Sequence, residues 1–148
     1  MDPNCIFCKI VAGQIPCHKL YEDDRVLAFL DLGPLSEGHA LVIPKHHTAN
    51  LADLPDDDAA AVGRVLPRLA KAISQAVQCP SYNVLVNFGE PAGQVVMHVH
   101  FHIIPKPTDA PRSGGQPGSG LGLHWPASKL DADRAKELTD KVTQILNR

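Results

Sequence analysis

The sequence predicts an α+β domain whose sheet is mainly antiparallel, and three observations lead to this prediction. Apolar segments of strand length come in two groups, at residues 19–46 and 81–104. A long segment between them and a shorter one near the C-terminal end have apolar residues at helical spacing instead. The order of strands, helix, strands and helix is typical of α+β domains.

Length and composition fit one such domain. The chain has 148 residues, of which 44% are hydrophobic and 20% charged, so it can bury a core. A formal net charge of −2 argues against a general binder of nucleic acid or of membranes, which would show a basic excess. The sequence has neither a bilayer-spanning apolar run nor the apolar stretch of a signal peptide. We therefore expect a soluble protein of the cytoplasm, with the nucleus as a further compartment.

The first half of the chain contains three expected strands and one helix. Strands are predicted in "KLYEDD", "RVLAFLDL" and "HALVIPKH", and a helix from Asp56 to Gln78 follows. Pro67 lies inside this helix, where its ring meets the carbonyl of Gly63. Because glycine lets the backbone yield, we expect one kinked helix there and not two.

The second half contains two expected strands, a loop and a short helix. Strands are predicted in "SYNVLVNF" and "VVMHVHFHII" (residues 95–104), with the glycine-bearing loop "GEPAGQ" between them. Residues 107–120 are rich in Pro, Gly and Ser, which predicts a mobile loop. A helix is predicted in "LDADRAKELTDKVTQIL", residues 130–146.

Three histidines occupy alternate positions in "HVHFH": His98, His100 and His102. In a strand they would point to one face, and three interpretations compete for them. An ordinary polar strand face is the first, although three histidines at this period make it a weak explanation. A catalytic zinc site is the second, but ligands about 6–7 Å apart in a line do not surround a tetrahedral ion well. Nucleophilic attack by a neutral imidazole on phosphorus or on an acyl carbon is the third.

The loop before the histidines supports the third interpretation. Gly89 and Gly93 allow backbone N–H groups to approach a phosphate. Histidine has an ordinary pKa of about 6.5, and like-charge repulsion disfavours protonation of all three rings. One ring can therefore remain a nucleophile at neutral pH while a neighbour donates a proton.

The four cysteines include one motif. Cys5 and Cys8 form a C-x-x-C pair, which in a cytosolic protein is more typical of metal or redox chemistry than of a structural disulfide. A structural zinc site would need two further ligands. Cys17 and Cys79 have no motif around them, and we expect them to be free thiols.

Taken together, these motifs resemble the histidine triad (HIT) family. "HVHFHII" matches the pattern His-φ-His-φ-His-φ-φ, and "AGQVV", "FLDLGPLSEGHALVIPKHH" and "YNVLVNFG" are similar to the rest of that domain. The resemblance covers about residues 5–106 and looks closest to the Hint branch, among its fungal and bacterial members with a C-x-x-C pair. It implies a single homodimeric domain over 1–148, in which the loop and a C-terminal segment (121–148) follow the core.

The resemblance also implies nucleotidyl transfer to water without a catalytic metal. His100 would attack the α-phosphate of a purine nucleoside monophosphate amide or ester and form a nucleotidyl-histidine, which water then releases. His102 would contact the phosphate and leaving group, and His98 would hold the local geometry. His39 matches a fourth, upstream histidine. The expected substrates are adenosine 5′-monophosphoramidate, AMP–lysine conjugates and aminoacyl-adenylates.

Further positions match the nucleotide contacts of the family. Asp31 matches the carboxylate that binds the ribose hydroxyls, and Asn87 matches the side chain near the phosphate. The purine slot, whose other interpretation is plain core, matches Ile6, Phe7, Ile10, Phe29 and Leu32. The phosphate loop matches Gly93, Gln94 and Val95.

Val95 is a departure, since many members have Ser or Thr there. Valine lacks the hydroxyl that donates to a phosphate oxygen or to the departing amine, although its backbone N–H remains. We therefore expect an altered leaving-group preference.

Members with the C-x-x-C pair bind a structural zinc. The resemblance maps its ligands onto Cys5, Cys8, His47 and His98, with His46 as the adjacent competitor of His47. A closed Cys₂His₂ set would supply folding energy and take no part in the reaction.

Three other functions stay open. The first is a Fhit-like dinucleoside polyphosphate hydrolase, against which the C-x-x-C pair, the short chain and the Trp-Pro of "LHWP" argue. The second is a nucleotide-binding interaction module with incidental catalysis, and the third is a hydrolase with the triad as metal ligands. Trp125 would either approach the partner subunit's site or pack on the C-terminal helix.

Overall fold

The computed structural model describes residues 1–107 and 127–147, which form a five-stranded antiparallel sheet with three α-helices. The strands are β1 (Lys19–Glu22), β2 (Val26–Leu30), β3 (Ala40–Pro44), β4 (Tyr82–Val86) and β5 (Phe101–Pro105), in the sheet order β1-β2-β3-β5-β4. The helices are α1 (Ile6–Val11), α2 (Asp56–Ala76) and α3 (Ala132–Leu146), with 3₁₀ turns η1 (Leu51–Asp53) and η2 (Glu90–Ala92). The predicted α+β class is confirmed.

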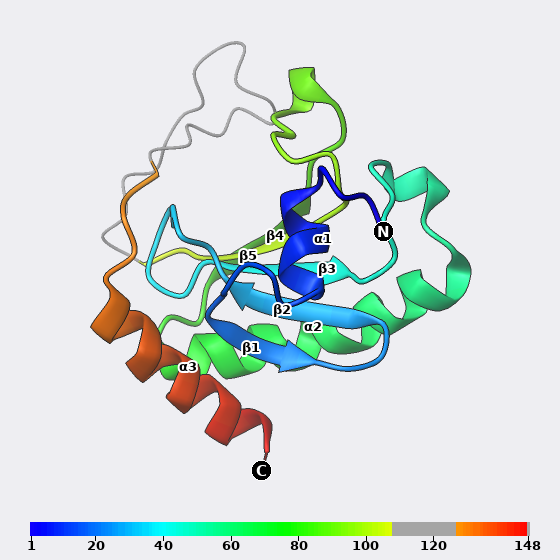
Figure 1. Cartoon of the computed structure of the whole chain (residues 1–148). Coiled ribbons are helices and arrows are strands. Elements are labelled where there is room, and N and C mark those ends of the chain that lie inside the picture. Colours follow the sequence, from blue (N-terminus) through cyan, green and yellow to red (C-terminus); the bar gives the residue numbers. More distant parts are fainter. Residues whose placement is uncertain (108–126, 148) are drawn as a thin grey trace.

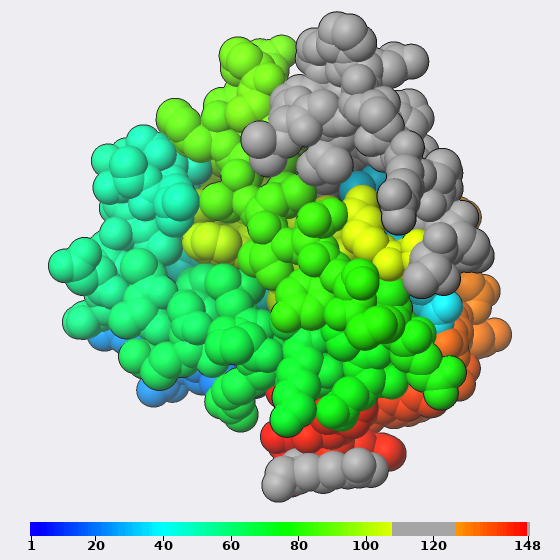
Figure 2. All heavy atoms as spheres, turned by 180° about the vertical axis from the view of Figure 1, so that it is seen from behind, coloured from blue at the N-terminus to red at the C-terminus, as the bar shows by residue number. Residues whose placement is uncertain are grey.

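The sheet separates two layers, with α1 on one face and α2 and α3 on the other (Figure 1). Alternate residues of β2 serve the two layers: Ala28 packs towards α2 and α3, whereas Leu27 and Phe29 pack in the cluster of α1. Every residue of β2 and β3 is buried as a result. Seen from behind, α2 crosses the lower part of the surface (Figure 2).

The short helix α1 was not predicted from the sequence. Six residues are too few to show a helical period, and a helix of this length does not stand alone in water. Its first turn is capped by Cys5, whose sulfur accepts a hydrogen bond from the backbone N–H of Cys8. Phe7 and Cys8 are buried against β2 and β3. Tertiary packing and this cap therefore hold α1 in place.

The last strand begins later than predicted. The sequence predicted a strand over 95–104, but β5 begins at Phe101, so His98 and His100 precede it and His102 lies within it. The ladders with β3 and β4 both end at Phe101. Before that point the chain makes other contacts, such as the 2.7 Å hydrogen bond from the N–H of Val99 to the carbonyl of Thr48. The prediction of the strand start was therefore wrong.

A close approach of α2 to the sheet fixes the backbone just before His39. Gly38 has a φ of +88°, and a Cβ there would lie 2.9 Å from Val77 Cγ1 and 3.1 Å from Ile73 Cγ2. Only glycine combines this left-handed conformation with so short a contact. The end of α2 therefore packs directly against the turn that leads into β3.

The other strands and α-helices agree with those predicted from the sequence. Residues 108–120 of the expected loop and Trp125 lie outside the described residues. Within the described part, none of the helices has the length and apolar character needed to cross a membrane. The central helix α2 continues through Pro67 as one helix, while the bend expected there stays a prediction.

Replacing Pro67 with alanine should raise the free energy of unfolding by about 1–2 kcal/mol. Alanine restores the helical N–H donor and removes the pressure of the ring on the carbonyl of Gly63, while greater freedom of the unfolded chain offsets part of this gain. Both positions are exposed, so no core contact is lost. Urea unfolding measures the change. The exposed Lys71→Ala variant is the control and should change stability by less than about 0.5 kcal/mol; a Pro67→Ala value equal to wild type would contradict the prediction.

Candidate functional site

A cavity of about 570 Å³ lies on the α1 face of the sheet. Apolar side chains of α1, β2 and the segment after α1 meet there with polar groups from the β4–β5 loop and the triad. Its described lining comprises Ile6, Phe7, Ile10, Ile15, Pro16, Cys17, Phe29, Leu30, Asp31, Leu32, Leu41, Asn87, Glu90, Pro91, Ala92, Gly93, Val95, Val96, His100 and His102. The cavity therefore offers apolar surface for a ring and a smaller number of polar groups.

The cavity brings together all but one of the predicted nucleotide contacts. The exception is Gln94, which is buried beneath the loop. Its Oε1 accepts a hydrogen bond from the N–H of Gly89 at 2.9 Å, and its Nε2 donates to the carbonyls of Ala49 and Val96 at 3.0 Å each. Gln94 therefore braces the loop through its side chain.

Sequence reasoning missed several lining residues. Ile15, Pro16 and Cys17 follow α1 in a segment without regular structure, where no period marks a site. Glu90 lies in η2, inside the loop that the glycines had already singled out. Its position among phosphate-loop residues was the signal that could have indicated it.

His100 is held in the form that a nucleophile needs. Its Nδ1 lies 2.7 Å from the carbonyl oxygen of His98. Because a carbonyl only accepts, Nδ1 carries the hydrogen, and Nε2 of the neutral ring keeps its lone pair. Burial lowers the pKa of His100, which favours this neutral form, and the ring of Phe7 packs edge-on at 5.1 Å. His100 Nε2 can therefore act as a nucleophile at neutral pH.

A hydrogen-bond chain sets the tautomer of His102. The N–H of Leu35 donates to Nδ1 of His39 at 3.0 Å, so the proton of the neutral His39 ring is on Nε2. That Nε2 donates to Nδ1 of His102 at 2.9 Å, which leaves the proton of His102 on its own Nε2. Burial lowers the pKa of His39 to about 4 and that of His102 to about 3, so both rings are neutral at pH 7. His102 therefore has an N–H donor beyond its contact with His39.

The same chain argues against a catalytic metal at these residues. Ligand atoms of Asp31, His39 and His102 lie within 4.8 Å of one another, as in a metal site. However, a metal on Nε2 of His39 would displace its proton while Nδ1 still accepts from Leu35. The ring would have to be an imidazolate, since a neutral imidazole has one donor and one acceptor nitrogen. The N–H of Leu35, His39 and His102 thus form a chain of hydrogen bonds, and an oxygen of Asp31 lies 3.5 Å from Nε2 of His39.

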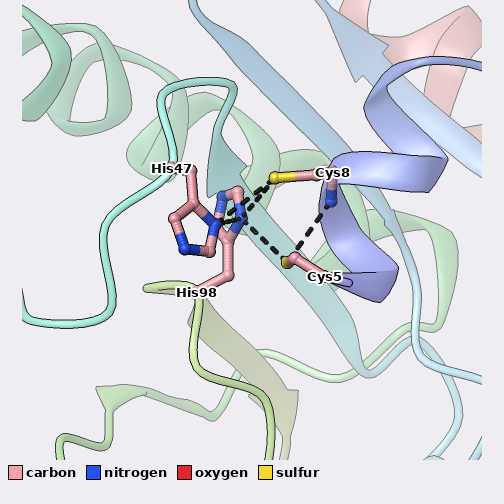
Figure 3. A group of neighbouring side chains, drawn as sticks. All are labelled: Cys5, Cys8, His47 and His98. Atoms are coloured by element: carbon pink, nitrogen blue, oxygen red, sulfur yellow. Dashed lines mark hydrogen bonds between the residues drawn. The ribbon is translucent and has the colours of Figure 1, made fainter. Parts of the chain in front are cut away.

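A second cluster has the donors and distances of a tetrahedral metal site (Figure 3). It joins Cys5 and Cys8 at the start of α1 to His47 after β3 and His98 before β5. His98 Nδ1 lies 3.5 Å from Cys5 Sγ, 3.7 Å from Cys8 Sγ and 3.3 Å from His47 Nδ1. Tetrahedral bonds of about 2.0–2.3 Å would place ligand atoms roughly 3.3–3.8 Å apart. The four residues can therefore hold a metal ion, and the exposed His46 does not belong to the cluster.

Neighbouring groups orient the two histidines of this metal cluster. His98 Nε2 donates to the carbonyl of Pro44 at 2.8 Å, which leaves its Nδ1 lone pair facing the cysteines. His47 Nε2 lies 3.8 Å from a carboxylate oxygen of Asp2. Such outer contacts are typical of metal-binding histidines. His98 therefore serves the metal cluster through its side chain and His100 through its carbonyl.

Comparisons with known proteins agree with this geometry. The HIT domain model matches residues 12–109. An adenosine 5′-monophosphoramidase of Schizosaccharomyces pombe is 46% identical over 140 residues, which cover 95% of this chain and 96% of that protein. An adenylylsulfatase of Arabidopsis thaliana is 50% identical over 106 residues, which cover 72% of this chain and 54% of that protein.

A solved structure is similar over nearly the whole chain. A Zn-bound histidine triad family protein from Mycobacterium smegmatis superposes with a TM-score of 0.79 at 32% identity, and the match covers 97% of this chain and 94% of that one. The domain match, the identities and the arrangement of the three histidines lead to one conclusion: the chain belongs to the histidine triad (HIT) family.

Proposed function

We propose that this chain hydrolyses purine nucleoside 5′-monophosphoramidates in the cavity beside His100. The observation that carries the proposal is the 2.7 Å contact between His100 Nδ1 and the carbonyl of His98, which leaves Nε2 as the nucleophile. The name of the S. pombe relative, an adenosine 5′-monophosphoramidase aligned over nearly the whole chain, supports the same reaction.

The cavity lining suggests how the nucleotide binds. The purine occupies the apolar slot of Ile6, Phe7, Ile10, Phe29 and Leu32. The ribose hydroxyls meet Asp31, whose Oδ1 also accepts from the N–H of Gly33 at 2.9 Å. The phosphate lies between the histidines and the loop that contributes Asn87, Gly93 and Val95. This placement directs the α-phosphorus towards His100.

The reaction proceeds in two displacements at phosphorus. His100 Nε2 forms a bond to phosphorus as the P–N bond of the substrate breaks, and the amine nitrogen takes the bonding electron pair and a proton from solvent. His102 Nε2–H donates a hydrogen bond to a phosphate oxygen, where negative charge develops. Water then attacks phosphorus, the bond from phosphorus to His100 Nε2 breaks with its electron pair returning to the ring, and a proton of the water passes to solvent. Over both steps one water is consumed, with a hydrogen on the amine and the hydroxyl on phosphorus.

Replacing His100 with alanine should lower turnover of a phosphoramidate by at least about a thousandfold, because no other group forms the covalent bond. Rapid-quench mass spectrometry of the wild type should show the mass of one nucleotide on the peptide that contains His100. The exposed His46→Ala variant is a control for histidine removal and should keep the adduct. An unchanged rate in His100→Ala would exclude the mechanism, and a larger rate on diadenosine triphosphate than on the amide would favour the Fhit-like alternative.

We also propose that the cluster of Cys5, Cys8, His47 and His98 binds a structural zinc ion. Two thiolates and two imidazoles close a tetrahedral shell, as structural sites require. Zinc there would contribute folding energy, while the reaction uses His100 and His102.

Inductively coupled plasma mass spectrometry of the purified wild-type protein should find about one zinc ion per chain. Cys8→Ser and His47→Asn should lose it and lower Tm by more than about 5 °C, because the buried donors lose their common partner. His46→Asn is the matched control and should keep both zinc and Tm. Full zinc content in Cys8→Ser would refute the ligand set.

We further propose a homodimer through the free edge of the sheet. β4 is an edge strand of the described sheet, and Tyr82, Val84, Phe88 and Met97 in and around it are exposed. An unpaired strand edge with apolar side chains is a ready surface for another chain. A second copy at β4 would join two sheets and cover this surface by two-fold symmetry.

A further inference from the structure

The cavity is unusual for a nucleotide site in its balance of charge. Its described lining contains the carboxylates of Asp31 and Glu90 but neither lysine nor arginine. The polar groups of this lining other than the two carboxylates are the side chains of Asn87, Cys17, His100 and His102. A substrate with several negative charges therefore finds no lysine or arginine in this lining with which to form an ion pair.

The two carboxylates serve different parts of the substrate. Asp31 follows β2, next to the purine slot, and it meets the ribose in the proposed binding mode. In-line displacement requires the leaving group to face away from His100 Nε2. With the purine slot and the ribose site occupied, the leaving group departs along the β4–β5 loop, where Glu90 and the strongly exposed Val95 line the cavity.

The loop holds the backbone of Glu90 close to the phosphate-binding residues. The N–H of Gly93 donates to the carbonyl of Glu90 at 2.9 Å, and the N–H of Gln94 donates to the carbonyl of Gly89 at 3.1 Å. Gln94 is itself anchored through the side-chain hydrogen bonds that fix the loop. The Glu90 side chain is exposed and forms no ion pair within residues 1–107 and 127–147. Its charge is therefore available to a group at the mouth of the cavity.

We propose that Glu90 selects for leaving groups by charge, favouring amines that carry a further positive charge and disfavouring anionic ones. This inference rests on the phosphoramidase function proposed above and adds to it a residue that determines specificity among amines, with amides of diamines as the favoured class. A cationic group beyond the P–N bond meets Glu90 as it departs, whereas a carboxylate, a sulfate or a polyphosphate is repelled. The side chain of Val95 contributes no competing hydrogen bond at the opening of the cavity.

Three adenosine 5′-phosphoramidates of similar length test the inference, with putrescine, n-butylamine or γ-aminobutyrate as the amine. The wild type should show the highest kcat/KM on the putrescine amide and the lowest on the γ-aminobutyrate amide. Glu90→Gln should reduce this ratio by about two- to fivefold, the effect of one exposed charge. Glu90→Lys should reduce it by about the square of that factor. Added salt should lower the kcat/KM ratio of the wild type, because it screens the charge of Glu90. It should not lower the ratio of Glu90→Gln, which lacks that charge.

The butylamine amide and a second variant keep the test decisive. The butylamine amide, whose leaving group carries no charge, is the reference to which each enzyme's rates on the other two amides are normalised. Asp24→Asn, which removes an exposed carboxylate in the turn before β2, should keep the wild-type ratio. Equal ratios in wild type, Glu90→Gln and Glu90→Lys, with normal turnover of the butylamine amide, would overturn the role of Glu90 alone. Absence of turnover on the butylamine amide by the wild type would overturn the proposed function and this inference together.

Discussion

The hydrogen bond from His100 Nδ1 to the carbonyl of His98 is the contact on which the rest of the site depends. At 2.7 Å it fixes both the orientation of the ring and the nitrogen that keeps a lone pair. An imidazole free to rotate would present either nitrogen, and the states with the N–H towards the substrate would be unreactive. The bond exists because the chain departs from strand geometry before Phe101, which lets a carbonyl two residues back reach the ring.

Burial then keeps the fixed rings neutral. Desolvation is the main cause that lowers the pKa of His39, His100 and His102, and neighbouring histidines add to it at His39 and His102. Backbone groups on both sides complete the arrangement, since the N–H of Leu35 orients His39 and the carbonyl of Pro44 orients His98. The histidine rings thus differ in orientation and in the nitrogen that carries the proton, because each ring meets different backbone atoms.

Alternate spacing predicts one shared face only for histidines in a strand, and His98 and His100 precede β5. The rings of His98 and His100 nevertheless both pack against Phe7, and His102 lines the same cavity as His100. The departure from strand geometry before Phe101 was not predictable, because "VVMHV" has the composition of a strand. The strand begins only at Phe101 because its pairing with β3 and with β4 ends there. The helix α1 escaped prediction for a related reason. Its six residues gain their stability from contacts with β2 and β3 that no local pattern encodes. The brace formed by Gln94 likewise joins segments 45 residues apart in the chain.

α1 also connects the proposed reaction to the proposed zinc site. Cys5 and Cys8 bring its first turn to His47 and His98, while Ile6, Phe7 and Ile10 form one wall of the apolar slot. A helix of six residues cannot hold that wall by its own hydrogen bonds. Coordination of the two thiolates would anchor the helix at its first turn and so keep the slot formed. The metal would then act on nucleotide affinity through the wall, and on the nucleophile through the carbonyl of His98, with no bond to the reacting phosphate.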